Sequence, residues 1–202
     1  MTSSPPANDA RDAELREIVA AGDIDRATDL AIRTYGPELI GWLSSIFPSE
    51  ADAYDAFSTM SEDLWRSLPR FDGRCSVRTW CYMLARHAAF HVRARPRNVH
   101  ETLRSHIPSL LGAVTHVWNT ARGTEQEVQN VYAEIRRQLP DEDQTLLVLR
   151  VDRNLAWRDV AIVLLGEAAN ADEVTRKAAT LRKQFERVKE RLRELAAERL
   201  DD

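Results

Sequence analysis

The sequence predicts an all-α protein built from two small helical domains that a linker joins. Apolar residues recur at the i, i+3, i+4 spacing of amphipathic helices in several stretches. Glycine and proline are sparse, at 7 and 8 of 202 residues, and no alternating apolar and polar run of strand length occurs. A chain of this length holds one domain or two small ones.

The N-terminal segment is predicted to support the first domain. Residues 1–22 are expected to form a partly disordered extension, because residues 1–10 are rich in polar residues and proline, with a short helix over 13–21. Asp23 is expected to cap the next helix. Gly36-Pro37 predicts a break or bend in that helix, and Pro48-Ser49 predicts a turn.

A helix with an acidic outer face is predicted over residues 53–68. Its apolar residues share one side, namely Ala53, Phe57, Met60, Leu64 and Leu68. The polar residues on the other side are Asp55, Thr59, Glu62, Asp63 and Arg66. An acidic face favours a protein partner over nucleic acid.

The next helix begins at Val77 and ends before Pro96. One predicted face is apolar and consists of Val77, Trp80, Cys81, Leu84, Ala88 and Val92. The predicted outer face consists of Thr79, Tyr82, Arg86, Phe90 and Arg93. Aromatic rings stack on unpaired bases and guanidinium groups hold phosphates, so this face suits single-stranded nucleic acid. The alternative is that the rings pack on a neighbouring helix and the arginines are solvated.

The charge distribution favours the nucleic-acid interpretation. Residues 66–97 carry eight arginines against Asp72 alone, a net charge of +7. Residues 1–63 carry four arginines against thirteen acidic residues, a net charge of −9. A basic block on a helix is typical of a polyanion partner, and the net charge of −4 for the whole chain conceals it.

Residues 98–124 are predicted to form a linker, and residues 125–202 a second domain. The linker has apolar residues at helical spacing, Ile107, Leu110, Leu111, Val114 and Trp118, which suit docking on a partner or on the chain itself. The second domain begins with a helix over 128–139, and a further helix starts at Pro140 with acidic residues in its first turn.

The last two helices predict a helix-turn-helix arrangement. A short helix spans 155–165, Gly166 stops it, and Asn170 with Glu173 resembles a capping box. A long amphipathic helix comes next, and its far face presents Arg176, Thr180, Lys183 and Arg187. A short helix, a turn and a basic helix suit major-groove binding. A coiled-coil or bundle helix with a mixed-charge surface is the alternative.

Residues 53–86 resemble region 2 of the sigma-70 superfamily, most closely that of the two-domain extracytoplasmic-function (ECF) sigma factors. The resemblance rests on A-x-D-(8 residues)-L-W-R-x-L-P-R-F followed by R-T-W-x-Y-x-L-A-R. It implies that residues 23–97 bind core RNA polymerase and the −10 promoter strand. The implied polymerase contacts are Asp55, Ser58, Thr59, Glu62 and Asp63. The implied −10 contacts are Arg78, Thr79, Tyr82, Arg86, Phe90, Arg93, Arg95 and Arg97.

The loop over 69–76 corresponds to one that helps capture a flipped −10 base in sigma factors.

Residues 125–202 resemble sigma region 4, which reads the −35 element. The implied −35 contacts are Arg176, Lys177, Thr180, Arg182, Lys183 and Arg187. Two positions depart from the family pattern. Relatives commonly have Gln-Glu at Ser58-Thr59. The thirteen residues between Gly166 and Thr180 are about nine more than usual, so the recognition helix starts early or the turn is enlarged.

The predicted function is therefore transcription initiation as an ECF sigma factor. Its expected partners are core RNA polymerase and promoter DNA, with an anti-sigma factor as a further candidate. A conventional helix-turn-helix regulator that does not use polymerase is the alternative. An enzyme is not expected, and no cofactor or metal is predicted, although His87 and His91 lie four residues apart. With no membrane-length apolar run and no signal peptide, we expect a cytoplasmic protein.

Overall fold

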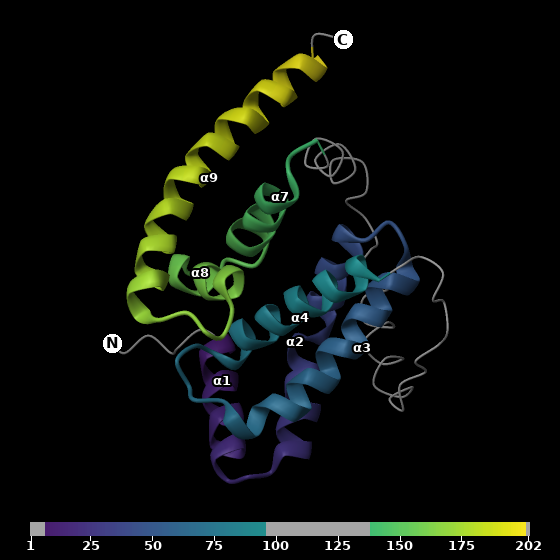
Figure 1. The fold of residues 1–202 in the computed structure, drawn as a ribbon, viewed down its shortest axis with the longest axis vertical. Helices are drawn as coiled ribbons and strands as arrows, with labels where there is room; N and C mark the ends of the chain where they lie inside the picture. The colour runs from purple at the N-terminus through teal and green to yellow at the C-terminus, as the bar shows by residue number, and fades with distance from the viewer. Residues whose placement is uncertain (1–6, 96–137, 201–202) are drawn as a thin grey trace. The chain divides into compact units, whose positions relative to one another are not determined.

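The computed structural model describes residues 7–95 and 138–200, which are helices and short connections (Figure 1). No strand occurs among these residues, so the all-α prediction is confirmed. They form two compact units that divide near residue 120, and each is described by itself. The predicted linker, Arg97 and residues 128–137 of the predicted helix over 128–139 lie outside the described residues.

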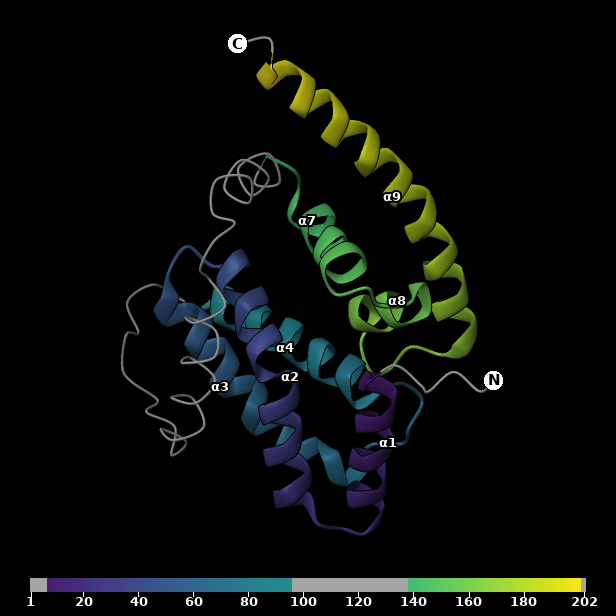
Figure 2. The same cartoon turned by 180° about the vertical axis from the view of Figure 1, so that it is seen from behind.

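The described part of the N-terminal unit is a helical bundle centred on α4 (Figure 2). Its elements are α1 (Ala7–Ala20), α2 (Ile24–Ile46), α3 (Glu50–Ser67), a 3₁₀ turn (Leu68–Arg70) and α4 (Val77–Ala94). Helix α4 contacts α1, α2 and α3. The expected disorder over residues 1–10 is wrong for residues 7–10, which already belong to α1.

Polar side chains fix the starts of three of these helices. As predicted, Asp23 caps α2, and its Oδ1 accepts a hydrogen bond from the Arg26 amide at 3.2 Å. The Ser49 hydroxyl caps α3 at 3.4 Å from the Asp52 amide. The Ser76 hydroxyl caps α4 at 3.0 Å from the Thr79 amide. Each side chain satisfies one amide that the first helical turn leaves without a partner.

A break or bend was predicted at Gly36-Pro37, and the break does not occur, because α2 continues through both residues. Proline removes one backbone donor from the helix, which destabilises a helix interior. Here both flanks lie in the core: Tyr35 and Leu39 are each 1% exposed. Burial of these side chains on either side of the proline outweighs the missing hydrogen bond.

The C-terminal unit consists of α7 (Asp141–Leu147), which continues as one π turn (Val148–Asp152), then α8 (Trp157–Leu165) and α9 (Ala171–Leu200). Gly166, predicted to stop α8, has a φ angle of 88°, and Asn154 before α8 has a φ angle of 51°. Helix α9 packs on α7 and α8. The apolar residues at its centre are Leu139, Leu147, Val188 and Leu195, with Phe185 and Leu192 against them.

Helix α9 starts at a reciprocal cap that the sequence predicted. The Asn170 side chain accepts from the Glu173 amide at 2.9 Å, and the Glu173 carboxylate accepts from the Asn170 amide at 2.9 Å. Nine residues of α9 precede Thr180. The extra residues of the sequence therefore lengthen the helix at its start, and they do not enlarge the turn.

We expect Asn170→Ala to destabilise the first turn of α9 by about 1 kcal/mol, because it removes the capping acceptor. Amides of that turn should exchange with solvent roughly fivefold faster in a hydrogen-exchange experiment, while those of α7 are unchanged. Asn170→Asp keeps an acceptor and is the matched control. Equal exchange in the alanine and aspartate variants would contradict the capping role.

Candidate functional site

The predicted polymerase-binding residues all lie on α3, outside the core. Asp55 is exposed, and Ser58, Thr59, Glu62 and Asp63 are half-buried. Arg66 lies 3.2 Å from Glu62 and 3.8 Å from Asp63. Surface ion pairs of this kind contribute little to stability, so this face of α3 remains acidic and available to a partner.

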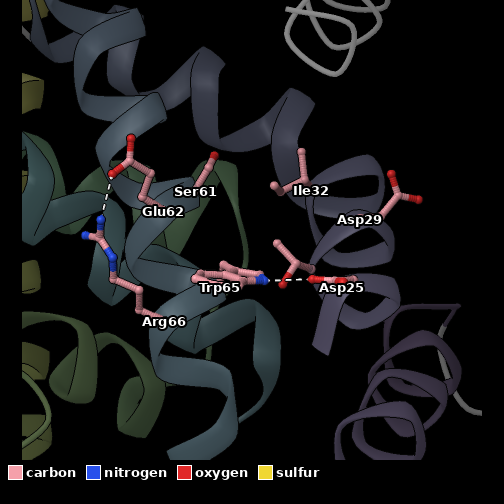
Figure 3. A pocket seen from close by; sticks show the side chains of 8 residues that line it. Asp25, Asp29, Ile32, Ser61, Glu62, Trp65 and Arg66 are labelled. Carbon is pink, nitrogen blue, oxygen red and sulfur yellow. Dashed lines mark hydrogen bonds and ion pairs between the residues drawn. The ribbon is translucent and has the colours of Figure 1, made fainter. Parts of the chain in front are cut away.

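Beside this face, α2 and α3 border a groove of about 340 Å³ (Figure 3). Trp65 is 51% exposed, and its indole nitrogen donates to the Asp25 carboxylate at 2.8 Å. The groove is lined by Asp25, Thr28, Asp29, Ile32, Ser61, Glu62, Trp65 and Arg66. It combines an aromatic ring with several carboxylates, a chemistry that suits a protein segment with apolar and basic side chains.

Helix α4 is buried on more of its circumference than its sequence pattern predicted. The predicted inner residues are buried, Trp80 among them at 4% exposed. Thr79 and Tyr82 were predicted to face outward, and both are 0% exposed. Tyr82 packs against Trp42 of α2 with ring centroids 5.5 Å apart. The predicted outward orientation of Thr79 and Tyr82 is therefore wrong, and neither side chain is exposed on the folded unit to contact the −10 strand.

Arg78 is engaged within the protein. Its guanidinium donates two hydrogen bonds to the Glu38 carboxylate of α2, at 2.7 and 2.8 Å. The two side chains are 14% and 21% exposed. The hydrogen bond to Glu38 raises the pKa of Arg78. This geometry assigns Arg78 to holding α4 on α2, and it leaves little of the side chain for a phosphate.

The remaining α4 residues form a basic and aromatic surface, defined here as Arg86, Phe90, Arg93 and Arg95. Phe90 is 70% exposed, Arg86 is half-buried, and Arg93 and Arg95 are exposed. The Arg93 guanidinium donates to the Ile46 carbonyl at 2.7 Å, which holds it at the end of α2. An exposed ring between guanidinium groups can stack on an unpaired base.

His87 and His91 are also exposed on α4. Within the described residues, no group of three His, Cys, Asp or Glu side chains is arranged to bind a metal ion. None of the helices over 7–95 and 138–200 combines the length and apolarity that a membrane span requires.

In the C-terminal unit, the predicted DNA contacts all lie along α9. Arg176, Thr180, Arg182, Lys183 and Arg187 are exposed, and Lys177 is half-buried. Helices α8 and α9 pack together across the turn that Gly166 opens. A short helix, a turn and a long helix with an exposed basic face are thus present, as a helix-turn-helix requires.

Comparison with known proteins supports the sequence-based interpretation of the N-terminal unit. Residues 31–97, which include α3, α4 and the part of α2 from residue 31 onward, match the family model described as Sigma-70 region 2. The chain is thus similar to sigma-70 factors over this segment. Over 160 residues it is also 26% identical to the RNA polymerase sigma-H factor of Pseudomonas aeruginosa, covering 76% of this chain and 82% of that protein. No solved structure matches it significantly.

The region 2 match and the similarity to a sigma factor support a role in transcription initiation, in which sigma factors act with core RNA polymerase and promoter DNA. The conventional regulator that does not use polymerase is not favoured.

Sequence reasoning missed three residues of the N-terminal unit whose contacts the structure shows. Asp25 and Trp65 meet across the groove, and Glu38 fixes Arg78. The two residues of each pair are 40 positions apart in the chain, so helical periodicity does not reveal that they are in contact. The available signal was Trp65 itself, a large aromatic residue outside the apolar stripe of its helix.

Proposed function

We propose that the chain is a sigma factor of the ECF type, in which residues 23–97 act as region 2 and residues 125–202 as region 4. The observation that carries this proposal is the region 2 match over the helices that bear the acidic groove and the α4 surface. Core RNA polymerase would bind the groove and the acidic face of α3. The non-template −10 strand would bind the α4 surface, and the −35 duplex would bind α9.

Opening the promoter requires a free-energy source, because base stacking stabilises duplex DNA by about 1.4 kcal/mol per step. Stacking of an unpaired base on an aromatic side chain contributes about 1–3 kcal/mol. Phe90 supplies such a ring, and the neighbouring arginines offset phosphate charge. Capture of the melted strand on α4 therefore offsets part of the melting cost, and no bond is made or broken by the protein.

The test is run-off transcription by core polymerase from the source organism, with and without this chain, on DNA upstream of its own gene. A transcript that depends on the chain would support the proposal, and its start would locate the −10 and −35 elements. Absence of a transcript, together with failure to co-purify with core polymerase, would contradict it.

We expect Trp65→Ala to weaken binding to core polymerase at least fivefold, or about 1 kcal/mol, because exposed aromatic residues in grooves carry much of an interface's free energy. Fluorescence anisotropy of labelled sigma factor titrated with core polymerase measures it. Phe90→Ala is the matched control, since it removes another exposed ring from the same unit. Equal affinity for the two variants would contradict the role of the groove.

In the C-terminal unit, we expect Lys183→Gln and Arg187→Gln each to weaken holoenzyme binding to the promoter. Each lost phosphate contact should reduce the slope of log K against log salt by about 1. Filter binding over a range of salt concentrations measures this slope. Lys189→Gln is a suitable control, because Lys189 is paired with Glu186 at 2.8 Å. An unchanged slope in both variants would remove Lys183 and Arg187 from the interface.

An anti-sigma factor that covers the same groove is a second proposed partner, and it would compete with core polymerase. The groove's exposed Trp65 and carboxylates support a protein ligand of either kind. The proposal includes no catalytic step by this chain. It places the chain in the cytoplasm, where bacterial core polymerase acts.

A further inference from the structure

The loop over residues 71–76, between the 3₁₀ turn and α4, is bound to the N-terminal helix α1. The Arg16 guanidinium donates to the Gly73 carbonyl at 3.2 Å and to the Cys75 carbonyl at 2.7 Å. The Asp12 carboxylate accepts from the Val77 amide at 2.5 Å, at the first residue of α4. Two side chains of α1 therefore hold both the middle and the end of this loop.

Asp12 and Arg16 also hold each other in place. The Arg16 Nε donates to Asp12 Oδ2 at 2.7 Å, and the carboxylate side chain is only 12% exposed. The Arg16 guanidinium also lies 5.8 Å from the centre of the Phe71 ring. A planar guanidinium that bonds a carboxylate and two carbonyls fixes direction as well as distance. The contact thus defines one shape for the loop.

Within the loop, Gly73 permits this close approach. Its φ angle is 74°, a conformation that favours glycine. A Cβ at this position would lie 3.2 Å from Arg16 Nη1. Next to it, the Asp72 carboxylate accepts from the Arg74 amide at 3.1 Å, and this bond lowers the pKa of Asp72. The loop is therefore an ordered turn whose tip is pinned from outside by α1.

We propose that Asp12 and Arg16 are positioning residues for promoter opening, which hold the 71–76 loop in the shape that receives an unpaired base of the −10 strand. The inference rests on the proposed function and on the resemblance of this loop, within residues 69–76, to the one that helps capture a flipped −10 base in sigma factors. Helix α1 precedes the matched region 2 segment at 31–97, yet it sets the shape of the loop. Ordering a loop before its ligand arrives reduces the entropic cost of binding.

The test measures base capture by holoenzyme reconstituted from the full chain and core polymerase. The DNA is forked, so that the −10 element lies on an unpaired strand. Run-off transcription first locates this element, and single abasic sites are then placed along the strand. With wild-type protein we expect one position where loss of the base lowers affinity about tenfold. With Arg16→Gln we expect this penalty to fall to about twofold, with core binding unchanged. A merely structural contact would not change the penalty at one base.

Arg11→Gln is the matched control, because Arg11 is exposed on the same helix and the change removes the same charge. It should retain the full tenfold penalty. Arg16→Lys keeps the charge but cannot span both carbonyls, so the loss of affinity at the abasic position should also become small. If Arg16→Gln fails to bind core polymerase, Arg16→Lys takes its place in the experiment.

A penalty that stays tenfold in an Arg16 variant that binds core polymerase would overturn the inference. Equal losses in the Arg11 and Arg16 variants would also overturn it, since they would trace to charge alone. Loss of core binding in both Arg16 variants would do the same, because it would indicate a general structural role. The proposed function fails separately, when wild-type protein yields no run-off transcript.

Discussion

Replacing Glu38 with alanine is expected to lower the free energy of unfolding of the N-terminal unit by about 3 kcal/mol, because it removes the carboxylate that pairs with a largely buried charge. The Arg78 guanidinium is 14% exposed and makes two hydrogen bonds to this carboxylate. It also lies 5.7 Å from the centre of the buried Tyr82 ring. Urea unfolding monitored by tryptophan fluorescence measures the change.

Asp29→Ala is the matched control for this prediction. It removes another carboxylate of α2 that pairs with an arginine, Arg33, at 2.8 Å, but both side chains are well exposed. Stability should hardly change, because exposed pairs are screened by solvent. The double variant Glu38→Ala with Arg78→Ala should recover part of the loss, since it removes the charge that Glu38 no longer compensates. Similar losses for Glu38→Ala and Asp29→Ala would contradict the buried pair.

Because Arg78 and Glu38 form a buried pair, an effect of Arg78 on folding can be distinguished from an effect on DNA binding. Any loss of promoter opening in Arg78→Ala should come with lower stability, because the side chain holds α4 against α2. Changes at Phe90 or Arg95 should affect DNA binding without that loss, since both residues are exposed. Stability measured beside strand affinity thus distinguishes an arginine that supports the interface from one that forms it.

The sequence predicted those helices best that bury a single face. In α3, the residues Phe57, Met60 and Leu64 are each at most 2% exposed, as their spacing required. In α9, apolar residues recur at helical spacing and are buried, namely Val174, Ala178, Leu181, Val188 and Leu195. Such helices face one layer of neighbours, so one stripe describes their burial. The capping residues could likewise be predicted, because caps depend on local sequence.

Helix α4 was predicted less well because it contacts three other helices. Its buried surface therefore includes Thr79, Tyr82 and Met83 as well as the predicted stripe. The run of apolar residues from Trp80 to Ala85 indicates a helix that is buried nearly all round. A helical wheel that assumes a single buried face placed the buried residues Thr79 and Tyr82 on the outer face. The continuity of α2 through Pro37 has the same origin, since packing partners, and not local preference, decide it.

The groove and the loop anchor could not be predicted because they join distant parts of the chain. The Trp65 indole meets Asp25 across 40 residues, and Arg16 meets Cys75 across 59. Amphipathic periodicity shows which side of each helix is buried, but it does not show which helices are neighbours. The sequence predicted where acidic and basic residues gather, but the shape of each surface follows from how the helices pack.

Phe90→Ala is expected to weaken binding of the unpaired −10 strand by about 2 kcal/mol, or roughly 30-fold, through loss of base stacking. The ring is 70% exposed, so its removal should hardly affect the stability of the unit. Binding of holoenzyme to a forked promoter with an unpaired −10 strand measures the change. Phe90→Tyr keeps an exposed ring and should bind the strand as wild type does.

The physical basis of this expectation is that Phe90 carries the one exposed Phe, Tyr or Trp ring of α4. Trp80 and Tyr82, the other two aromatic residues of the helix, are 4% and 0% exposed. Tyr82→Phe, which keeps the buried ring, should therefore leave strand affinity unchanged. If Phe90→Ala bound the forked promoter as tightly as wild type while Tyr82→Phe bound it weakly, the burial of Tyr82 could not persist in the complex. Strand capture would then require α4 to separate from Trp42, against which the Tyr82 ring packs.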